Sequence, residues 1–133
     1  MVAKTPPKHK FETFRRACSI KGAVVVEKAV RAVAKDHFGL NTQQDILDLI
    51  AAGGLEQLQH KNTAPLSYGH QKNIGKMIDA YEFKIGHKSG YIAFHLNFLD
   101  NWVVKSFHPP TFGENSAALT HNPFRHLLEN KNK

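Results

Sequence analysis

The sequence predicts an α+β fold, with N-terminal helices packed on a C-terminal antiparallel β-meander of at least three strands and a short C-terminal helix. Two patterns support this class. Apolar residues recur at helical spacing in the first half of the chain, and they alternate with polar residues from Ile78 to His108. The 133 residues are the size of one domain. We expect residues 1–9 to be a flexible basic arm and residues 10–133 to form a single domain.

The first two helices are predicted from apolar spacing and from the residues that end them. A short first helix has one apolar face, made of Phe11, Phe14 and Cys18. The second helix is expected from about Ala23 to His37, because Gly39 is well placed to stop it. Its beginning could instead be extended, since the residues Val24–Val26 are β-branched.

The middle of the chain predicts further helix and then a loop. A third helix is expected over Thr42–Ala52, because Asn41 and Gln44 have the spacing of a capping box. A short fourth helical piece is expected at Leu55–His60. We predict a connecting loop over Lys61–Gly75, where proline and glycine residues interrupt regular structure.

From Ile78 onward the pattern changes to the alternation of strands. We predict three strands, each with one apolar face. Pro109-Pro110 would end the third strand, because neither residue can donate a hydrogen bond to a neighbouring strand. Asn122-Pro123 would then begin the C-terminal helix, which is expected to continue to about Glu129.

The pairing of these strands predicts a row of ionisable side chains on the polar face of the sheet. A four-residue turn at His87–Gly90 keeps the apolar residues together and sets Glu82 opposite His95. A three-residue loop at Leu99–Asn101 then sets His95 opposite Lys105. Directly opposed residues have Cβ atoms about 5 Å apart, so the three side chains could share one phosphate-sized ligand.

Such a row could cleave a phosphodiester. Glu82 would take the proton of a ribose 2′-OH, His95 would protonate the leaving oxygen, and Lys105 would hold the phosphate. His108 is a further acid–base candidate. The candidate substrate-binding residues on this face and its turns are Tyr91, Lys84, Asn97 and His87. The alternative interpretation is that these side chains only keep an exposed sheet face soluble.

The charge balance points to a polyanionic partner. The chain has 18 Lys and Arg against 11 Asp and Glu, a formal net charge of +7, and the excess is concentrated in residues 1–35. This field attracts RNA or another polyanion, or an acidic protein. The candidate nucleic-acid-binding residues are Arg15, Arg16, Lys21, Lys28 and Arg31. A basic surface that only maintains solubility is the simpler alternative.

The cysteine and histidine content argues against metals and disulfides. Cys18 is the only cysteine, which excludes a disulfide within the chain and fits a reducing compartment. The nine histidines have no HxH or HExxH spacing, so we expect no metal and no other cofactor. No secretory signal or membrane-spanning segment is visible, and we expect a cytoplasmic protein.

The segments Gly90–Phe98 and Asn101–His108 resemble the sheet of small RNases, a class that includes barnase, the colicin tRNases, and the RelE-like and MqsR-like toxins. The order of helices followed by a meander shares this resemblance, which covers roughly residues 78–108. It implies catalytic groups on the sheet face and a cognate inhibitor (antitoxin) as partner. Glu82, Lys105 and His95 match one known catalytic set of that class by residue type. The arginine-rich strands of RelE-like toxins are missing, which argues against ribosome-dependent cleavage.

Three functions therefore stand beside one another at this point. The first is a metal-independent endoribonuclease of toxin type. The second is a non-catalytic basic module that binds nucleic acid or an acidic partner. The third is an inhibitor or adaptor whose sheet edge pairs with another protein.

Overall fold

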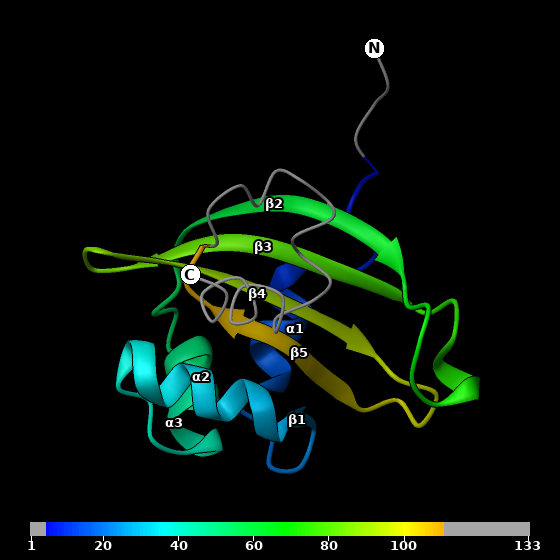
Figure 1. Cartoon of the computed structure of the whole chain (residues 1–133), viewed down its shortest axis with the longest axis horizontal. Helices are drawn as coiled ribbons and strands as arrows, with labels where there is room; N and C mark the ends of the chain where they lie inside the picture. The colour runs from blue at the N-terminus through cyan, green and yellow to red at the C-terminus, as the bar shows by residue number, and fades with distance from the viewer. Residues whose placement is uncertain (1–4, 111–133) are drawn as a thin grey trace, which may run out of the picture.

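The computed structural model describes residues 5–110 and has an α+β architecture (Figure 1). Within these residues three α-helices and a short 3-10 helix accompany a five-stranded mixed sheet. The elements follow one another as α1 (Phe11–Ala17), β1 (Val24–Val26), α2 (Lys28–Phe38), α3 (Gln43–Ala51), β2 (Glu56–Pro65), the 3-10 helix (Gln71–Asn73), β3 (Met77–Ile85), β4 (Lys88–Leu96) and β5 (Trp102–His108). The helix predicted from Asn122 lies outside the described residues. No helix in the described part is long and apolar enough to cross a membrane.

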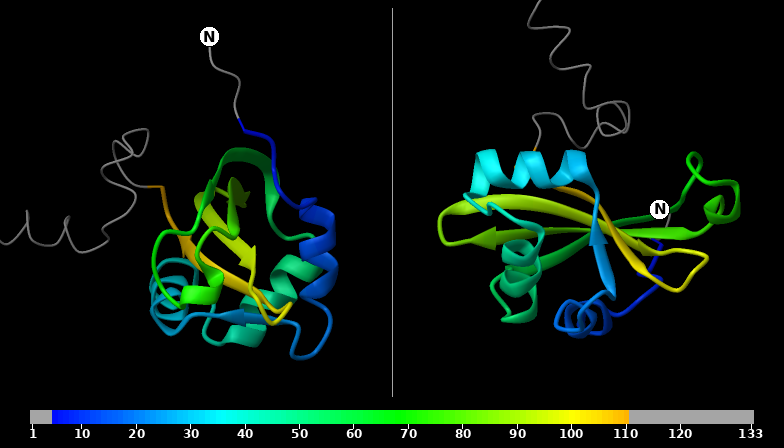
Figure 2. Two further views of the ribbon diagram at one scale, coloured as in Figure 1. Left: turned by 90° about the vertical axis from the view of Figure 1, so that its right-hand side faces the viewer. Right: turned by 90° about the horizontal axis from the view of Figure 1, so that it is seen from below.

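The strands of the sheet lie in the order β1-β5-β4-β3-β2, from the bottom to the top of Figure 1. Neighbouring strands are antiparallel, except that β1 runs parallel to β5. Figure 2 shows α1 and α3 on one side of the sheet and α2 on the other side, next to β5. We call the side that α1 and α3 cover the helix-covered face. The opposite side, where α2 lies next to β5, is the second face.

The helix-covered face holds an aromatic core. The rings of Phe14 on α1 and Phe94 on β4 stack with centroids 4.0 Å apart, and neither residue is exposed. Trp102 and Tyr81 extend this cluster along β5 and β3. Apolar residues alternate along the three strands, so their other side chains project onto the second face.

The prediction of a helical piece at Leu55–His60 and a loop over Lys61–Gly75 is wrong, because β2 occupies Glu56–Pro65. This strand is at the edge of the sheet, and most of its side chains are exposed on both faces. It therefore lacks the apolar alternation by which a half-buried strand is recognised. Two irregularities in its pairing with β3 further blur the pattern.

Two helix boundaries also differ from expectation. The β-branched residues Val24–Val26 form β1, the alternative that the sequence left open, and α2 begins only at Lys28. The capping box of α3 lies one residue later than predicted: the Thr42 hydroxyl accepts from the Asp45 amide, and the Asp45 carboxylate accepts from the Thr42 amide. The Gln44 side chain instead donates to Asp48.

The predicted strand register is wrong as well. The β3–β4 turn has two residues, Gly86 and His87, because Ile85 pairs directly with Lys88. Gly86 has a φ of 60°, which a two-residue hairpin turn requires. Between β4 and β5 a bulge falls after Ala93, and the loop is five residues long. Side chains of β3, β4 and the beginning of β5 keep their predicted faces, but they meet different partners across the sheet. After the bulge the faces are exchanged: Phe107, which strict alternation from Trp102 places on the polar face, is buried against Phe83, and His108 lies on the second face.

Candidate functional site

Three side chains lie in a row across β3, β4 and β5 on the second face. Glu82 is directly opposite Tyr91, and Tyr91 is directly opposite His108. The rings of Tyr91 and His108 stack, with centroids 5.1 Å apart and an angle of 21° between their planes. All three residues are partly exposed, so this Glu82–Tyr91–His108 row meets solvent. It brings together a carboxylate, a phenol and an imidazole.

Basic and polar groups surround the carboxylate end of the row. The Lys61 ammonium on β2 lies 3.8 Å from a Glu82 carboxylate oxygen. Lys84 is exposed two residues further along β3, opposite Ser89. Glu82, Lys84 and Ser89 line a depression of about 150 Å³ at this end of the sheet. The positive charges are placed to attract a phosphate toward Glu82.

The His108 imidazole has a defined orientation. Its Nδ1 atom lies 2.7 Å from the carbonyl oxygen of Pro109. A carbonyl oxygen can only accept a hydrogen bond, so Nδ1 carries a proton and Nε2 is the atom that can gain or lose one. An imidazole held in this way is suited to general acid–base chemistry.

The predicted row of Glu82, His95 and Lys105 does not form. His95 is opposite Val103, and Lys105 lies in the bulge of β5 between the residues that pair with β4. On β4, His95 is four residues from Tyr91, the partner of Glu82, which is about 13 Å along an extended strand. Glu82 is therefore separated from the other two groups, although all three residues belong to the same strands as predicted.

His95 is also unsuited to the predicted role of general acid. Only 2% of its surface is exposed, and its Nδ1 has no hydrogen-bond partner among the described residues. Burial lowers the pKa of His95, and the positive charge of Lys105 lowers it further. A neutral imidazole that does not reach solvent cannot protonate a bound substrate.

Lys105 is held by residues that the sequence did not single out. Its ammonium lies 2.8 Å from the carboxylate of Glu27, the residue before α2, and 5.3 Å from the centroid of the Tyr68 ring. This ion pair occupies the lysine that was expected to hold phosphate. We refer to Glu27, Lys105 and Tyr68 as the Lys105 cluster.

Two further predicted substrate-binding residues lie in turns. The Asn97 side chain accepts hydrogen bonds of 2.9 Å from the amides of Leu99 and Asn101, so it stabilises the β4–β5 loop. His87 is exposed in the β3–β4 turn. Of the four predicted substrate-binding residues, Tyr91 and Lys84 are thus the ones that lie at the row.

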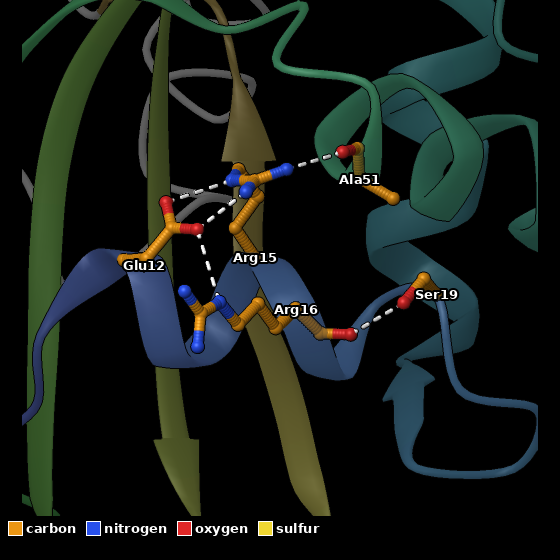
Figure 3. Close-up of polar contacts among 5 residues, drawn as sticks. All are labelled: Glu12, Arg15, Arg16, Ser19 and Ala51. Carbon is orange, nitrogen blue, oxygen red and sulfur yellow. Dashed lines mark hydrogen bonds and ion pairs between the residues drawn. The ribbon is translucent and has the colours of Figure 1, made fainter.

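The predicted nucleic-acid-binding residues divide into two groups. The Arg15 guanidinium is used within the protein: it pairs with Glu12 and donates a 2.6 Å hydrogen bond to the carbonyl of Ala51, which joins α1 to the end of α3 (Figure 3). Arg16 also bonds to Glu12, but most of its side chain is exposed. The other three residues are exposed on the surface: Lys21, Lys28 and Arg31.

Among residues 5–110 the structure offers neither a reactive thiol nor a metal-binding group. Cys18 is buried beside α1, and burial raises the pKa of its thiol to about 12. In residues 5–110 no three histidine, cysteine, aspartate or glutamate side chains are grouped so that they could hold a metal ion.

Sequence reasoning missed Lys61, Tyr68 and Glu27. Lys61 lies in the edge strand that was predicted as a loop, and Tyr68 follows it before the 3-10 helix. Glu27 meets Lys105 only because β1 pairs with β5 in parallel, a contact between distant parts of the chain. No local pattern in the sequence reports such a pairing.

Comparisons with known proteins give no match. No family model, no curated protein and no solved structure matches the chain.

Proposed function

We propose that the protein is a metal-independent endoribonuclease of toxin type that cleaves RNA at the Glu82–Tyr91–His108 row. The observation that carries this proposal is the alignment of a carboxylate, a phenol and an imidazole on three neighbouring strands of one face. The roles first assigned to His95 and Lys105 pass to His108 and to the lysines beside Glu82.

The spacing of the row suits an in-line displacement at phosphorus. The attacking and leaving oxygens lie on opposite sides of the phosphorus atom, so the base and the acid must stand apart. Glu82 and His108 are on the two strands that flank β4, which places their backbones about 10 Å apart. The phosphate would lie between them, above Tyr91.

The reaction follows from these positions. Glu82 takes the proton of the ribose 2′-OH, and the 2′ oxygen forms a bond to phosphorus. The bond from phosphorus to the 5′ oxygen breaks, and His108 in its protonated form gives that oxygen its proton through Nε2. The products are a 2′,3′-cyclic phosphate and a 5′-OH. Tyr91 donates to a non-bridging oxygen, while Lys61 and Lys84 stabilise the phosphate charge.

We also propose where this activity takes place and which protein controls it. The net charge of +7 attracts RNA, and the resemblance to small RNase toxins implies a cytoplasmic target and a cognate inhibitor protein. An acidic inhibitor that covered the row would complement the basic surface and block the substrate at once.

The test is RNA cleavage by purified protein in excess EDTA. We expect wild-type protein to degrade RNA and Glu82→Gln and His108→Ala each to lower the rate at least 100-fold, the usual contribution of a general base or acid. Circular dichroism checks that both variants fold. Asp36→Asn and His87→Ala are the controls, because each removes an ionisable group from an exposed position outside the row. Full activity in both row variants would overturn the assignment.

One observation favours the non-catalytic basic module as a second candidate. Lys28, Arg31 and Lys35 are all exposed and are spaced along α2 so that they share one side of the helix. This candidate predicts RNA binding that weakens steeply with salt and is lost when the three charges are reversed. It also predicts that Glu82→Gln and His108→Ala leave binding unchanged and that no preparation cleaves RNA.

A further inference from the structure

Tyr68 presents an exposed aromatic ring that is nevertheless held in place. It lies in the loop between β2 and β3, and 64% of its surface is exposed. The Lys105 ammonium is positioned over the ring, 5.3 Å from its centroid. Lys105 is itself fixed by a 2.8 Å ion pair with Glu27, and only 15% of the Lys105 side chain is exposed. The Tyr68 ring therefore packs against a lysine whose position is fixed by an ion pair.

The same loop contributes a second combination of ring and cation. The rings of His70 and Phe98 stack with centroids 4.6 Å apart, and the Lys72 ammonium lies 5.4 Å from the Phe98 centroid. The Asn73 side chain accepts a 2.9 Å hydrogen bond from the Phe98 amide, which joins this loop to the β4–β5 loop. Aromatic rings interleaved with lysines are typical of surfaces that bind single-stranded nucleic acid.

Lys105 also relates Tyr68 to the Glu82–Tyr91–His108 row. Lys105 and His108 are on the same strand, three residues apart, which is about 10 Å along an extended chain. A strand of RNA whose phosphate occupies the row can therefore bring a neighbouring nucleotide to Tyr68. The exposed part of the ring is available for a base, while Lys105, paired with Glu27, holds the ring from the other side.

We propose that Tyr68 is a base-stacking subsite, set by Lys105 and Glu27, that binds a nucleotide adjacent to the cleaved bond and selects single-stranded RNA. This inference rests on the proposed function. Stacking on a ring needs an unpaired base, whereas the bases of a duplex stack on one another. The preference for single strands follows from this requirement.

The test is binding of a 2′-O-methyl single-stranded oligonucleotide, which cannot be cleaved by attack of a 2′-OH, measured by fluorescence anisotropy. We expect Tyr68→Ala to raise Kd about 5–150-fold, as for loss of one stacked base, and Tyr68→Phe to keep Kd within about twofold. Ile74→Ala is the matched control, because it removes an exposed apolar side chain from the same loop. A duplex of the same sequence should compete poorly.

The outcomes separate the subsite from the proposed function. Unchanged binding by Tyr68→Ala, or equal competition by the duplex, would overturn the subsite while the cleavage assay decides the function independently. If wild-type protein does not bind the oligonucleotide at all, the subsite is also wrong. Cleavage of unmodified RNA by that same preparation would then show that the row still acts without Tyr68.

Discussion

At the scale of single residues, burial decides what an ionisable side chain can do. His95 and His108 are on neighbouring strands of the same sheet, and each follows a phenylalanine in the sequence. The structure buries His95 and leaves His108 partly exposed with its Nδ1 bound to a carbonyl. The first is therefore a core residue, and the second presents an oriented imidazole at the surface.

The burial of His95 predicts a specific pH dependence of stability. The pKa of His95 is lowered in the folded protein, whereas the unfolded chain has an ordinary value of about 6.5. Below that pH the unfolded state binds more protons, so the free energy of unfolding should fall as pH decreases from 7.5 toward 5.5. His9 has a lowered pKa for the same main reason, burial, and adds to this trend.

Replacing His95 tests whether this side chain causes the loss of stability at low pH. We expect His95→Leu to reduce the loss of stability between about pH 7.5 and 5.5, measured by urea unfolding at both values. His87→Ala should leave the loss unchanged, because His87 is exposed. Equal pH dependence in wild type and His95→Leu would contradict the account. Glu12 does not interfere, because Arg15 holds its pKa at about 2, far below this window.

At the scale of elements, the alternation of apolar residues predicts on which face of the sheet a side chain lies. It does not predict which residue lies opposite it on the neighbouring strand. The predicted and observed pairings of β3 with β4 differ by four residues, since Glu82 was expected opposite His95 and is opposite Tyr91. A shift by an even number leaves every side chain on its face. The helix-covered face of β3 and β4 could thus be predicted from the sequence. The row at the candidate site could not, because it also depends on the bulge in β5, which turns Phe107 into the core and His108 onto the second face.

The turn and a single glycine explain the observed register. The two-residue turn at Gly86 and His87 sets Phe83 opposite Gly90. A Cβ atom at position 90 would lie 2.2 Å from the Phe83 ring, so the ring packs where that atom would be. In the sequence this glycine was interpreted only as part of a longer turn. Gly90 is required because the Phe83 ring packs against it, and this contact forms only when β3 and β4 are paired.

This contact predicts the effect of Gly90→Ala. The buried Phe83 ring would have to move, and we expect the free energy of unfolding to fall by about 1–3 kcal/mol, the usual cost of overpacking. Urea unfolding measures the change. Ser89→Ala, at the neighbouring and partly exposed position, should change stability by no more than about 0.5 kcal/mol. A neutral Gly90→Ala would show that Phe83 does not need this space.

At the scale of the whole molecule, the buried Asp79 joins the N-terminal residues to the sheet. Its carboxylate accepts hydrogen bonds from the backbone amides of Lys8 and His9, at 2.8 and 2.9 Å, and from the Thr63 hydroxyl at 2.6 Å. Asp79 is fully buried on β3. The last two residues of the predicted basic arm are thus bound in the fold, and the His9 ring also contacts Trp102.

We expect Asp79→Ala to release this segment. Three donors, one of them the hydroxyl of the buried Thr63, would lose their acceptor, so the free energy of unfolding should fall by about 2 kcal/mol. Trypsin should cut after Lys8 and Lys10 earlier than in wild-type protein, as followed by mass spectrometry. Asp36→Ala, at an exposed position on α2, is the control. Unaltered stability and unaltered cleavage would show that the carboxylate does not anchor the N-terminal residues.

The central claim for the whole molecule is that the Glu82–Tyr91–His108 row drives attack of a ribose 2′-OH on the adjacent phosphate. The most direct measurement uses a DNA oligonucleotide that carries one ribonucleotide, incubated with the protein in EDTA. The account predicts cleavage only after the ribonucleotide, with a 2′,3′-cyclic phosphate at the new end, and a rate at least about 100-fold lower for Glu82→Gln. Cleavage of an all-deoxy oligonucleotide, or full activity in Glu82→Gln, would contradict it.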